Sequence, residues 1–242
     1  YRADVLHAIA ATWIFLLLSL IVIRSERWQG LWFAGCAVAV AAFAPLVWSI
    51  EFRPWLPAPL AAYLNIKTGS LFPLFPWSAF MMAGAAFACW FVVARRRGME
   101  RPFMLQLAVL GIAWILVGHF SGPFRFLPEA ASTDWWADPR TFLLRLGIVL
   151  LLLGACYSYG LVRTPKKSPL LDVSRESLFV YVSHLLLIYG PFWGGRSTAE
   201  VVGRTQGPVT CLVASVALAG LMVAGARAWG AIKQRKILLN GR

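Results

Sequence analysis

The stretch FLLRLGIVLLLLGACYSYGLV, residues 142–162, decides the fold class of this chain. It runs for 21 residues with Arg145 as its one charged side chain. It also lacks the two-residue alternation of a lipid-facing β-strand. A helix of about 20 apolar residues crosses the roughly 30 Å hydrocarbon core of a bilayer. We therefore predict that this stretch is a transmembrane helix.

Six other apolar runs have a similar length. Together the seven predicted spans are 5–23, 31–50, 75–94, 103–120, 142–162, 177–193 and 208–229. The 242 residues are 60% hydrophobic and 14% charged, a composition that excludes an ordinary water-soluble domain. The sequence predicts an all-α, polytopic transmembrane helix bundle, with residues 1–242 as a single domain.

A net charge of +13 could indicate a nucleic-acid partner. Most of the basic residues, however, lie in the connections between the predicted spans, as in a membrane protein. The connections on one side hold fourteen Lys/Arg and four Asp/Glu, whereas the other side holds eight and six. The richer set is 24–30, 95–102, 163–176 and 230–242. By the positive-inside rule it is cytoplasmic. We predict membrane lipids as partners and no nucleic acid.

The cysteines and short motifs of the sequence indicate neither a disulfide, nor a metal site, nor a known catalytic motif. The four cysteines, Cys36, Cys89, Cys156 and Cys211, lie inside apolar runs, so no disulfide and no metal-ligand spacing is implied. Gly-rich phosphate loops, nucleophile elbows and zinc motifs are absent from the sequence. We expect no metal.

The three histidines each lie in or beside an apolar run. Asp4 and His7 are three residues apart, so they share a helix face on which the carboxylate can fix the tautomer of the imidazole and raise its basicity. This arrangement suits a general base. The alternative is that Asp4 only caps the helix and His7 bonds a neighbouring backbone group.

The span 177–193 carries a polar stripe. Ser177, Tyr181 and His184 follow one another at spacings of four and three, which places them on one face. The stripe lines a hydrophilic passage or forms interhelical hydrogen bonds that hold the bundle together. His119, at the outer end of the span 103–120, contacts substrate or is a hydrated interfacial histidine, and the second interpretation is favoured.

Two long outer connections, 51–77 and 121–140, mix charges, prolines and aromatic residues. We expect them to lie on the outer face and to cover a pocket there. Five outer cations are candidates for binding an anionic substrate: Arg53, Lys67, Arg125, Arg140 and Arg145. Plain interfacial exposure is the favoured alternative, and of the five we select Arg53 as the substrate-binding residue.

Three segments resemble a known family. RADVLHAIA (2–10), SLFPLFPWSAFMMAGAAF (70–87) and LDVSRESLFVYVSHLLLIYG (171–190) are similar, in order and approximate spacing, to bacterial membrane proteins related to the catalytic domain of heparan-alpha-glucosaminide N-acetyltransferase. The last segment also resembles the closing helix of the wider membrane acyltransferase superfamily.

The resemblance implies an enzyme that moves an acyl group from a cytoplasmic acyl-CoA, such as acetyl-CoA, to a saccharide or glycan acceptor across the membrane. It carries over His7, Trp77 with the preceding Pro76, Tyr181 and His184. It also implies a place in the bacterial cytoplasmic (inner) membrane, and it leaves a homo-oligomer open. The family's opening helix, with an Arg-Gly pair and a histidine, would precede Tyr1, so we expect further residues upstream. If the principal catalytic histidine lies there, His7 and His184 are supporting residues.

The full prediction is a membrane-bound acyltransferase. The expected catalytic residues are His7, Asp4 and His184, and the expected substrate-binding residues are Arg53, Trp77, His119, Tyr181 and Ser177. Arg53 is expected to stabilise the developing oxyanion. Arg95 to Arg97 and Lys166 to Lys167 are expected to attract the phosphates of acyl-CoA.

The competing hypothesis is a transporter or a non-enzymatic scaffold of the inner membrane, for example for a lipid-linked sugar. Paired half-helices and an inverted repeat, which would support it, are absent from the sequence. On the other hand, the sequence contains no complete set of catalytic residues, so the transporter or scaffold hypothesis stays open.

Overall fold

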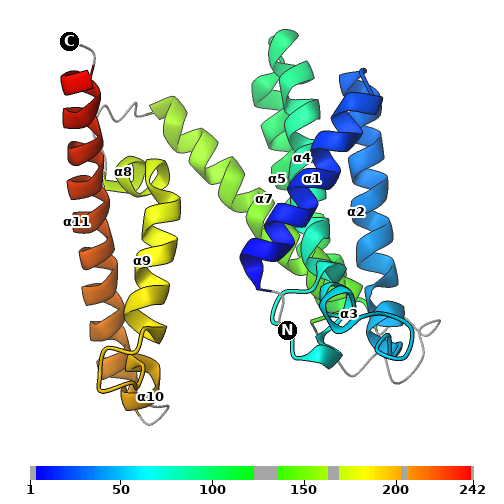
Figure 1. The fold of residues 1–242 in the computed structure, drawn as a ribbon. Coiled ribbons are helices and arrows are strands. Elements are labelled where there is room, and N and C mark those ends of the chain that lie inside the picture. Colours follow the sequence, from blue (N-terminus) through cyan, green and yellow to red (C-terminus); the bar gives the residue numbers. More distant parts are fainter. Residues whose placement is uncertain (1–3, 123–135, 163–168, 203–205, 241–242) are drawn as a thin grey trace. The chain divides into compact units, whose positions relative to one another are not determined.

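The computed structural model describes residues 4–122, 136–162, 169–202 and 206–240. Within these ranges every regular element is a helix, which confirms the all-α prediction (Figure 1). The chain divides into two compact units, residues 1–162 and 163–242, and each is described on its own. The association of both units into a single domain stays a prediction.

Unit 1 is built from five long helices. They are α1 (Val5–Val22), α2 (Glu26–Ser49), α4 (Leu74–Arg96), α5 (Glu100–Phe120) and α7 (Pro139–Val162). Successive long helices run in alternating directions (Figure 1). All five are long and apolar enough to cross a membrane. Between α2 and α4 the chain forms α3 (Ala58–Leu64) and the 3₁₀ helix η1 (Ile66–Thr68).

Unit 2 contains α8 (Pro169–Arg175), α9 (Ser177–Tyr189), α10 (Thr198–Val202) and α11 (Pro208–Asn240). The part Pro208–Lys233 of α11 is a sixth helix able to span a membrane. Six such helices make the chain an integral membrane protein. The predicted span 177–193 is a shorter helix of 13 residues. It ends where Gly190 N–H closes onto Leu186 O at 2.7 Å, because Pro191 disfavours helical backbone at the residue before it.

Small residues let the helices of unit 1 approach closely. Helices α2 and α4 pack on each other, and one buried cluster joins Ala37 and Ala41 of α2 to Ala79, Ala83 and Ala86 of α4. At Gly30 an added Cβ would lie 2.3 Å from Trp90 Nε1. Between α5 and α7, a Cβ on Gly147 would lie 2.6 Å from the Gly111 carbonyl oxygen. Close backbone approach of this kind is how membrane helices gain packing energy.

The connection 51–73 is held against the end of α2. The buried Asn65 donates from Nδ2 to Ile50 O at 2.8 Å and to Val47 O at 3.2 Å. Lys67 Nζ donates to Ser49 O at 2.7 Å, where a cation also suits the negative end of the α2 dipole. Trp48 Nε1 donates to Phe75 O at 2.7 Å, which places the start of α4 beside α2. The second connection is described only at its ends, because residues 123–135 lie outside the described ranges.

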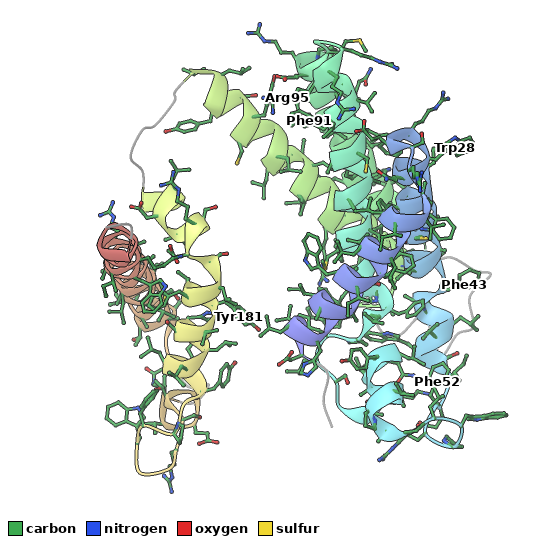
Figure 2. All side chains as sticks on the ribbon, turned by 45° about the horizontal axis from the view of Figure 1, so that its top comes forward. Trp28, Phe43, Phe52, Phe91, Arg95 and Tyr181 are labelled. Atoms are coloured by element: carbon green, nitrogen blue, oxygen red, sulfur yellow. The ribbon has the colours of Figure 1, made fainter. Side chains whose placement is uncertain are left out.

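The two ends of unit 1 differ in charge. The α1–α2 and α4–α5 turns meet at one end, where Arg96 Nη1 lies 2.8 Å from Glu26 Oε1. Arg95 and Trp28 mark this end in Figure 2, and Phe52 marks the opposite one. The opposite end holds the start of α1, the connection 51–73 and the start of α7 (Figure 1). We call the first the basic end and the second the histidine end, after His7.

Candidate functional site

Asp4 and His7 form a pair at the start of α1. Asp4 Oδ1 accepts a hydrogen bond from His7 N at 3.1 Å, and the same oxygen lies 2.6 Å from His7 Nδ1. Asp4 is therefore both the helix cap and the carboxylate partner of the imidazole, and the role of His7 as a general base stays a prediction. The side chains are 51% and 41% exposed, which leaves them accessible to a ligand.

The pair orients the imidazole for proton transfer. Because the carboxylate accepts at Nδ1, the neutral ring carries its hydrogen there, and Nε2 is the nitrogen with the lone pair. Burial alone would raise the pKa of Asp4, but the hydrogen bonds from the His7 side chain and backbone outweigh burial and leave that pKa lowered. The ring of His7 also meets the Tyr63 ring of α3 edge-on, with centroids 6.3 Å apart.

A pocket of about 420 Å³ opens between α1, α4 and α7 at the same end of unit 1. We call it the histidine-end pocket. Its wall is mostly apolar, and Phe72 from the connection 51–73 contributes to it, as expected of a covering segment. The lining residues are Val5, Ala8, Ile9, Thr12, Phe72, Trp77, Ser78, Phe80, Met81, Arg145 and Val149. Trp77, predicted to bind substrate, is among them.

Arg145 is the one charged residue of this wall. Its guanidinium carbon lies 4.3 Å from the centroid of the Trp136 ring and 5.7 Å from that of Trp77. The two indoles are themselves 5.7 Å apart, and Phe72 packs edge-on against Trp77 at 5.1 Å. Cation–π contacts with two rings hold the cation in place at the wall of the pocket.

Two other predicted residues of unit 1 lie outside this wall. Arg53 is exposed in the turn that follows α2, and His119 is exposed near the end of α5 with its ring edge-on to Phe120 at 4.8 Å. Exposure is compatible with both interpretations of His119, so its role stays a prediction. The structure does not place either residue beside the Asp4–His7 pair.

In unit 2, Tyr181 and His184 pack together on α9. Their rings meet edge-on with centroids 5.4 Å apart, while Ser177 is exposed at the start of the helix. His184 Nδ1 lies 3.0 Å from Val180 O, so the neutral ring carries its hydrogen on Nδ1 and its lone pair on Nε2.

The opposite face of α9 packs on α11. Phe179 stacks on Trp229 of α11, with ring centroids 5.3 Å apart. Tyr181 is two residues further on, about 200° around the helix, and so points away from α11 (Figure 2). Two acidic residues of the segment 171–190 form ion pairs with α11. Asp172 lies 3.0 Å from Arg227, and Glu176 lies 2.9 Å from Lys233.

A second pocket, of about 690 Å³, lies at the basic end of unit 1. Four arginines line it: Arg24, Arg27, Arg96 and Arg97. Its floor includes Trp90 and the first residues of α2, whose N-terminal dipole also favours anions. Lys166 and Lys167, which the sequence groups with Arg95 to Arg97, lie outside the described residues.

Residues 3–120 match the model of a protein family described as heparan-alpha-glucosaminide N-acetyltransferase, catalytic. Over these residues the chain resembles that family. The match covers α1 to α5, including the Asp4–His7 pair, Trp77 and most of the lining of both pockets. No curated protein and no solved structure matches the chain.

The matched residues include two of the three segments that resemble the family. RADVLHAIA and SLFPLFPWSAFMMAGAAF fall within or at the edge of the matched residues, whereas LDVSRESLFVYVSHLLLIYG lies beyond them. His7 and Trp77 therefore lie within the residues that match the acetyltransferase family, and Tyr181 and His184 lie outside them. The roles of all four residues stay predictions.

Sequence reasoning gave no site role to three residues that the structure brings into these sites, Tyr63, Arg24 and Arg27. It named Arg145 only as one of five outer cations and did not select it as a site residue. Arg145 carried a usable signal, as the one charge in a run of 21 residues, because an ionisable residue in a spanning helix marks a functional contact by default. Among the described residues, no three His, Cys, Asp or Glu side chains are grouped to hold a metal ion.

Proposed function

We propose that this protein is a membrane-bound acyltransferase that moves an acyl group, such as acetyl, from a cytoplasmic acyl-CoA to a saccharide or glycan acceptor on the outer side of the bacterial inner membrane. The observation that carries the proposal is the Asp4–His7 pair, 2.6 Å apart, within the residues that match the acetyltransferase family. The family match supports the general reaction class. The donor, the acceptor and the sidedness are part of the proposal.

The basic end suits the donor. The 3′-phosphate and diphosphate of an acyl-CoA carry several negative charges, and four arginine guanidiniums line the pocket there. The positive-inside rule assigns this end to the cytoplasm, where acyl-CoA is made. Arg24 and His7 are seventeen residues apart, which is about 26 Å along a helix. The acyl group must therefore pass most of the way along the bundle from the donor to the acceptor.

At the histidine end, His7 serves as the general base. Its Nε2 accepts the proton from the acceptor hydroxyl or amine while the new bond forms to the acyl carbon. The C–S bond of the thioester then breaks, and the leaving CoA thiolate takes up the proton held by His7, which restores the neutral base. Asp4 stabilises the imidazolium that forms, because its carboxylate lies on Nδ1. The predicted cation for the oxyanion of the tetrahedral intermediate is Arg53, in the turn that follows α2 at this end of unit 1.

The test is transfer of labelled acetyl from acetyl-CoA sealed inside vesicles to an outward-facing saccharide. His7→Ala should lower turnover by roughly 10²–10⁴-fold with the amount of folded protein unchanged, because general-base catalysis contributes about that factor. Asp4→Asn should lower it less, since it removes only the orienting charge.

The matched control is Leu6→Ala, one position away and 41% exposed, which should transfer acetyl like the wild type. Full turnover by a well-folded His7→Ala variant would remove His7 from the mechanism. Absence of transfer by the wild type to every glycan acceptor would favour the transporter or scaffold hypothesis.

A further inference from the structure

The histidine-end pocket has an apolar interior. Its two hydroxyls are already bonded to the backbone of their own helices: Thr12 Oγ1 donates to Ala8 O at 2.7 Å and Ser78 Oγ donates to Leu74 O at 2.8 Å. The remaining wall around them is formed by aliphatic and aromatic side chains and Arg145. Such a wall is a poor match for a saccharide, whose hydroxyls need hydrogen-bond partners, and a good match for a hydrocarbon chain.

The pocket runs inward from the end of the helices. On α1 its lining extends from Val5 to Thr12, which is about 10 Å along the axis. On α7 it extends from Arg145 to Val149, one turn further into the span. A ligand in it therefore meets the cation near the end of the helices and apolar side chains deeper inside.

The electrostatics of the outer part favour an anion. Arg145 is fixed against Trp77 and Trp136, and a guanidinium binds phosphate oxygens through a planar fork of donors. In addition α1, α4 and α7 all begin at this end, so three helix N-termini direct their positive ends toward the same region (Figure 1). The ligand defined by these features is an amphiphile with a negative head and a hydrocarbon tail.

We propose that this pocket binds the phosphate and the first part of the hydrocarbon chain of a lipid-linked saccharide, and that this lipid is the acyl acceptor. The inference rests on the proposed function and adds the class of acceptor to it. Val5 lines the pocket one residue after Asp4 and two before His7, so the mouth of the pocket and the Asp4–His7 pair lie within one turn of each other along α1, on different faces of the helix. A saccharide attached to a phosphate at Arg145 reaches the pair around the start of α1. The pocket holds the anchor, and the histidine acts on the sugar.

Binding is measured with the purified full chain in nanodiscs, using a polyprenyl monophosphate and the corresponding neutral polyprenol as probes. Arg145→Gln should weaken binding of the phosphate at least tenfold and leave binding of the alcohol unchanged. Val149→Trp should weaken both, because the indole fills the deeper part of the pocket. The charge control is Arg196→Gln, an exposed arginine of unit 2, and the bulk control is Val109→Trp, an exposed valine of α5. Both controls should bind like the wild type.

Arg145→Lys separates the effect on folding from the effect on phosphate recognition. It keeps a positive charge beside Trp77 and Trp136 but removes the planar set of guanidinium donors. It should retain the thermal stability of the wild type and bind the phosphate more weakly. Wild-type binding by a folded Arg145→Gln variant would overturn the proposal. Equal competition by phosphatidylglycerol would also overturn it, because the pocket would then be a general phospholipid site.

The transfer assay supplies the second arm. With a phosphate-linked lipid saccharide as acceptor, Arg145→Gln should raise KM at least tenfold with little change in kcat, and with the free saccharide the variant and the wild type should be alike. Transfer by the wild type to the free saccharide alone would overturn this inference and leave the proposed function standing. Transfer to neither acceptor, with the lipid phosphate still bound, would overturn the proposed function and the role of the lipid as acceptor together.

Discussion

Asp4 does two tasks with one carboxylate oxygen at the start of α1. It caps the helix through His7 N and orients the imidazole through His7 Nδ1. The spacing of three residues is what makes this possible, since residue N3 of a helix presents both its backbone N–H and its side chain to the cap. Because one carboxylate both caps the helix and orients the imidazole, we expect mutation of Asp4 to affect stability and turnover together.

The lowered pKa of Asp4 makes the cap dependent on pH. A carboxylate whose pKa in the folded protein lies below its ordinary value of about 3.9 stabilises the fold above that pH. The contribution is lost as the pH falls through the lowered value. We expect Asp4→Ala to be less stable than the wild type by about 0.5–2 kcal/mol near neutral pH.

That difference should begin to shrink below about pH 4, the ordinary range of an Asp carboxyl, and should vanish as the pH falls through the lowered pKa of Asp4. Thermal unfolding in detergent micelles from pH 3 to pH 7 measures it. Glu51→Ala removes an exposed carboxylate at the same end and serves as the control. A stability difference that stays constant across the range would contradict the role of the charged form.

At the scale of elements, α5 and α7 are joined by a crossing at which glycine is required. A Cβ on Gly147 would lie 2.6 Å from Gly111 O and 2.8 Å from a side-chain carbon of Ile115. The first of these contacts is with backbone, so it cannot be relieved by a change of rotamer. The position of Arg145 depends on this crossing, because it lies two residues before Gly147 on the same helix.

Gly147→Ala should therefore destabilise unit 1 by about 1–3 kcal/mol, the usual cost of overpacking. The matched control is Gly160→Ala on the same helix, where an added Cβ would meet nothing within 4 Å. Thermal unfolding in micelles compares the two variants. Equal unfolding temperatures would show that the crossing can widen without loss.

For the whole molecule, charge sets the expected orientation in the membrane. The ion pair between Arg96 and Glu26 brings two of the four basic connections to one end of unit 1. The positive-inside rule then predicts that this end is cytoplasmic and that the connection 51–73 is outside. The direction of acyl transfer in the proposed function depends on this orientation.

Single-cysteine labelling tests the orientation in a background in which Cys36, Cys89, Cys156 and Cys211 are replaced. An impermeant maleimide applied from outside should label Trp55→Cys, at a site 82% exposed, and should label Arg97→Cys only after the membrane is opened. Labelling of Arg97→Cys in sealed cells would reverse the topology and remove the donor site from the cytoplasm.

Local patterns in the sequence determined much of this protein. Long apolar runs predicted the spanning helices, and one short spacing predicted the contact of Asp4 with His7, because helix formation and capping depend on residues within a few positions of each other. The sequence overestimated the length of the span 177–193, where a proline just after the helix outweighed the apolar pattern. The basic connections likewise predicted a basic end.

Only the tertiary structure decided which residues share a site. Arg145 lies between Trp77 and Trp136, and Tyr63 meets His7, across separations along the chain that no periodicity encodes. Which faces of two helices meet depends on where small residues allow the backbones to approach, as at Gly111 and Gly147. The histidine-end pocket therefore arises from packing, while the helices that surround it arise from local sequence.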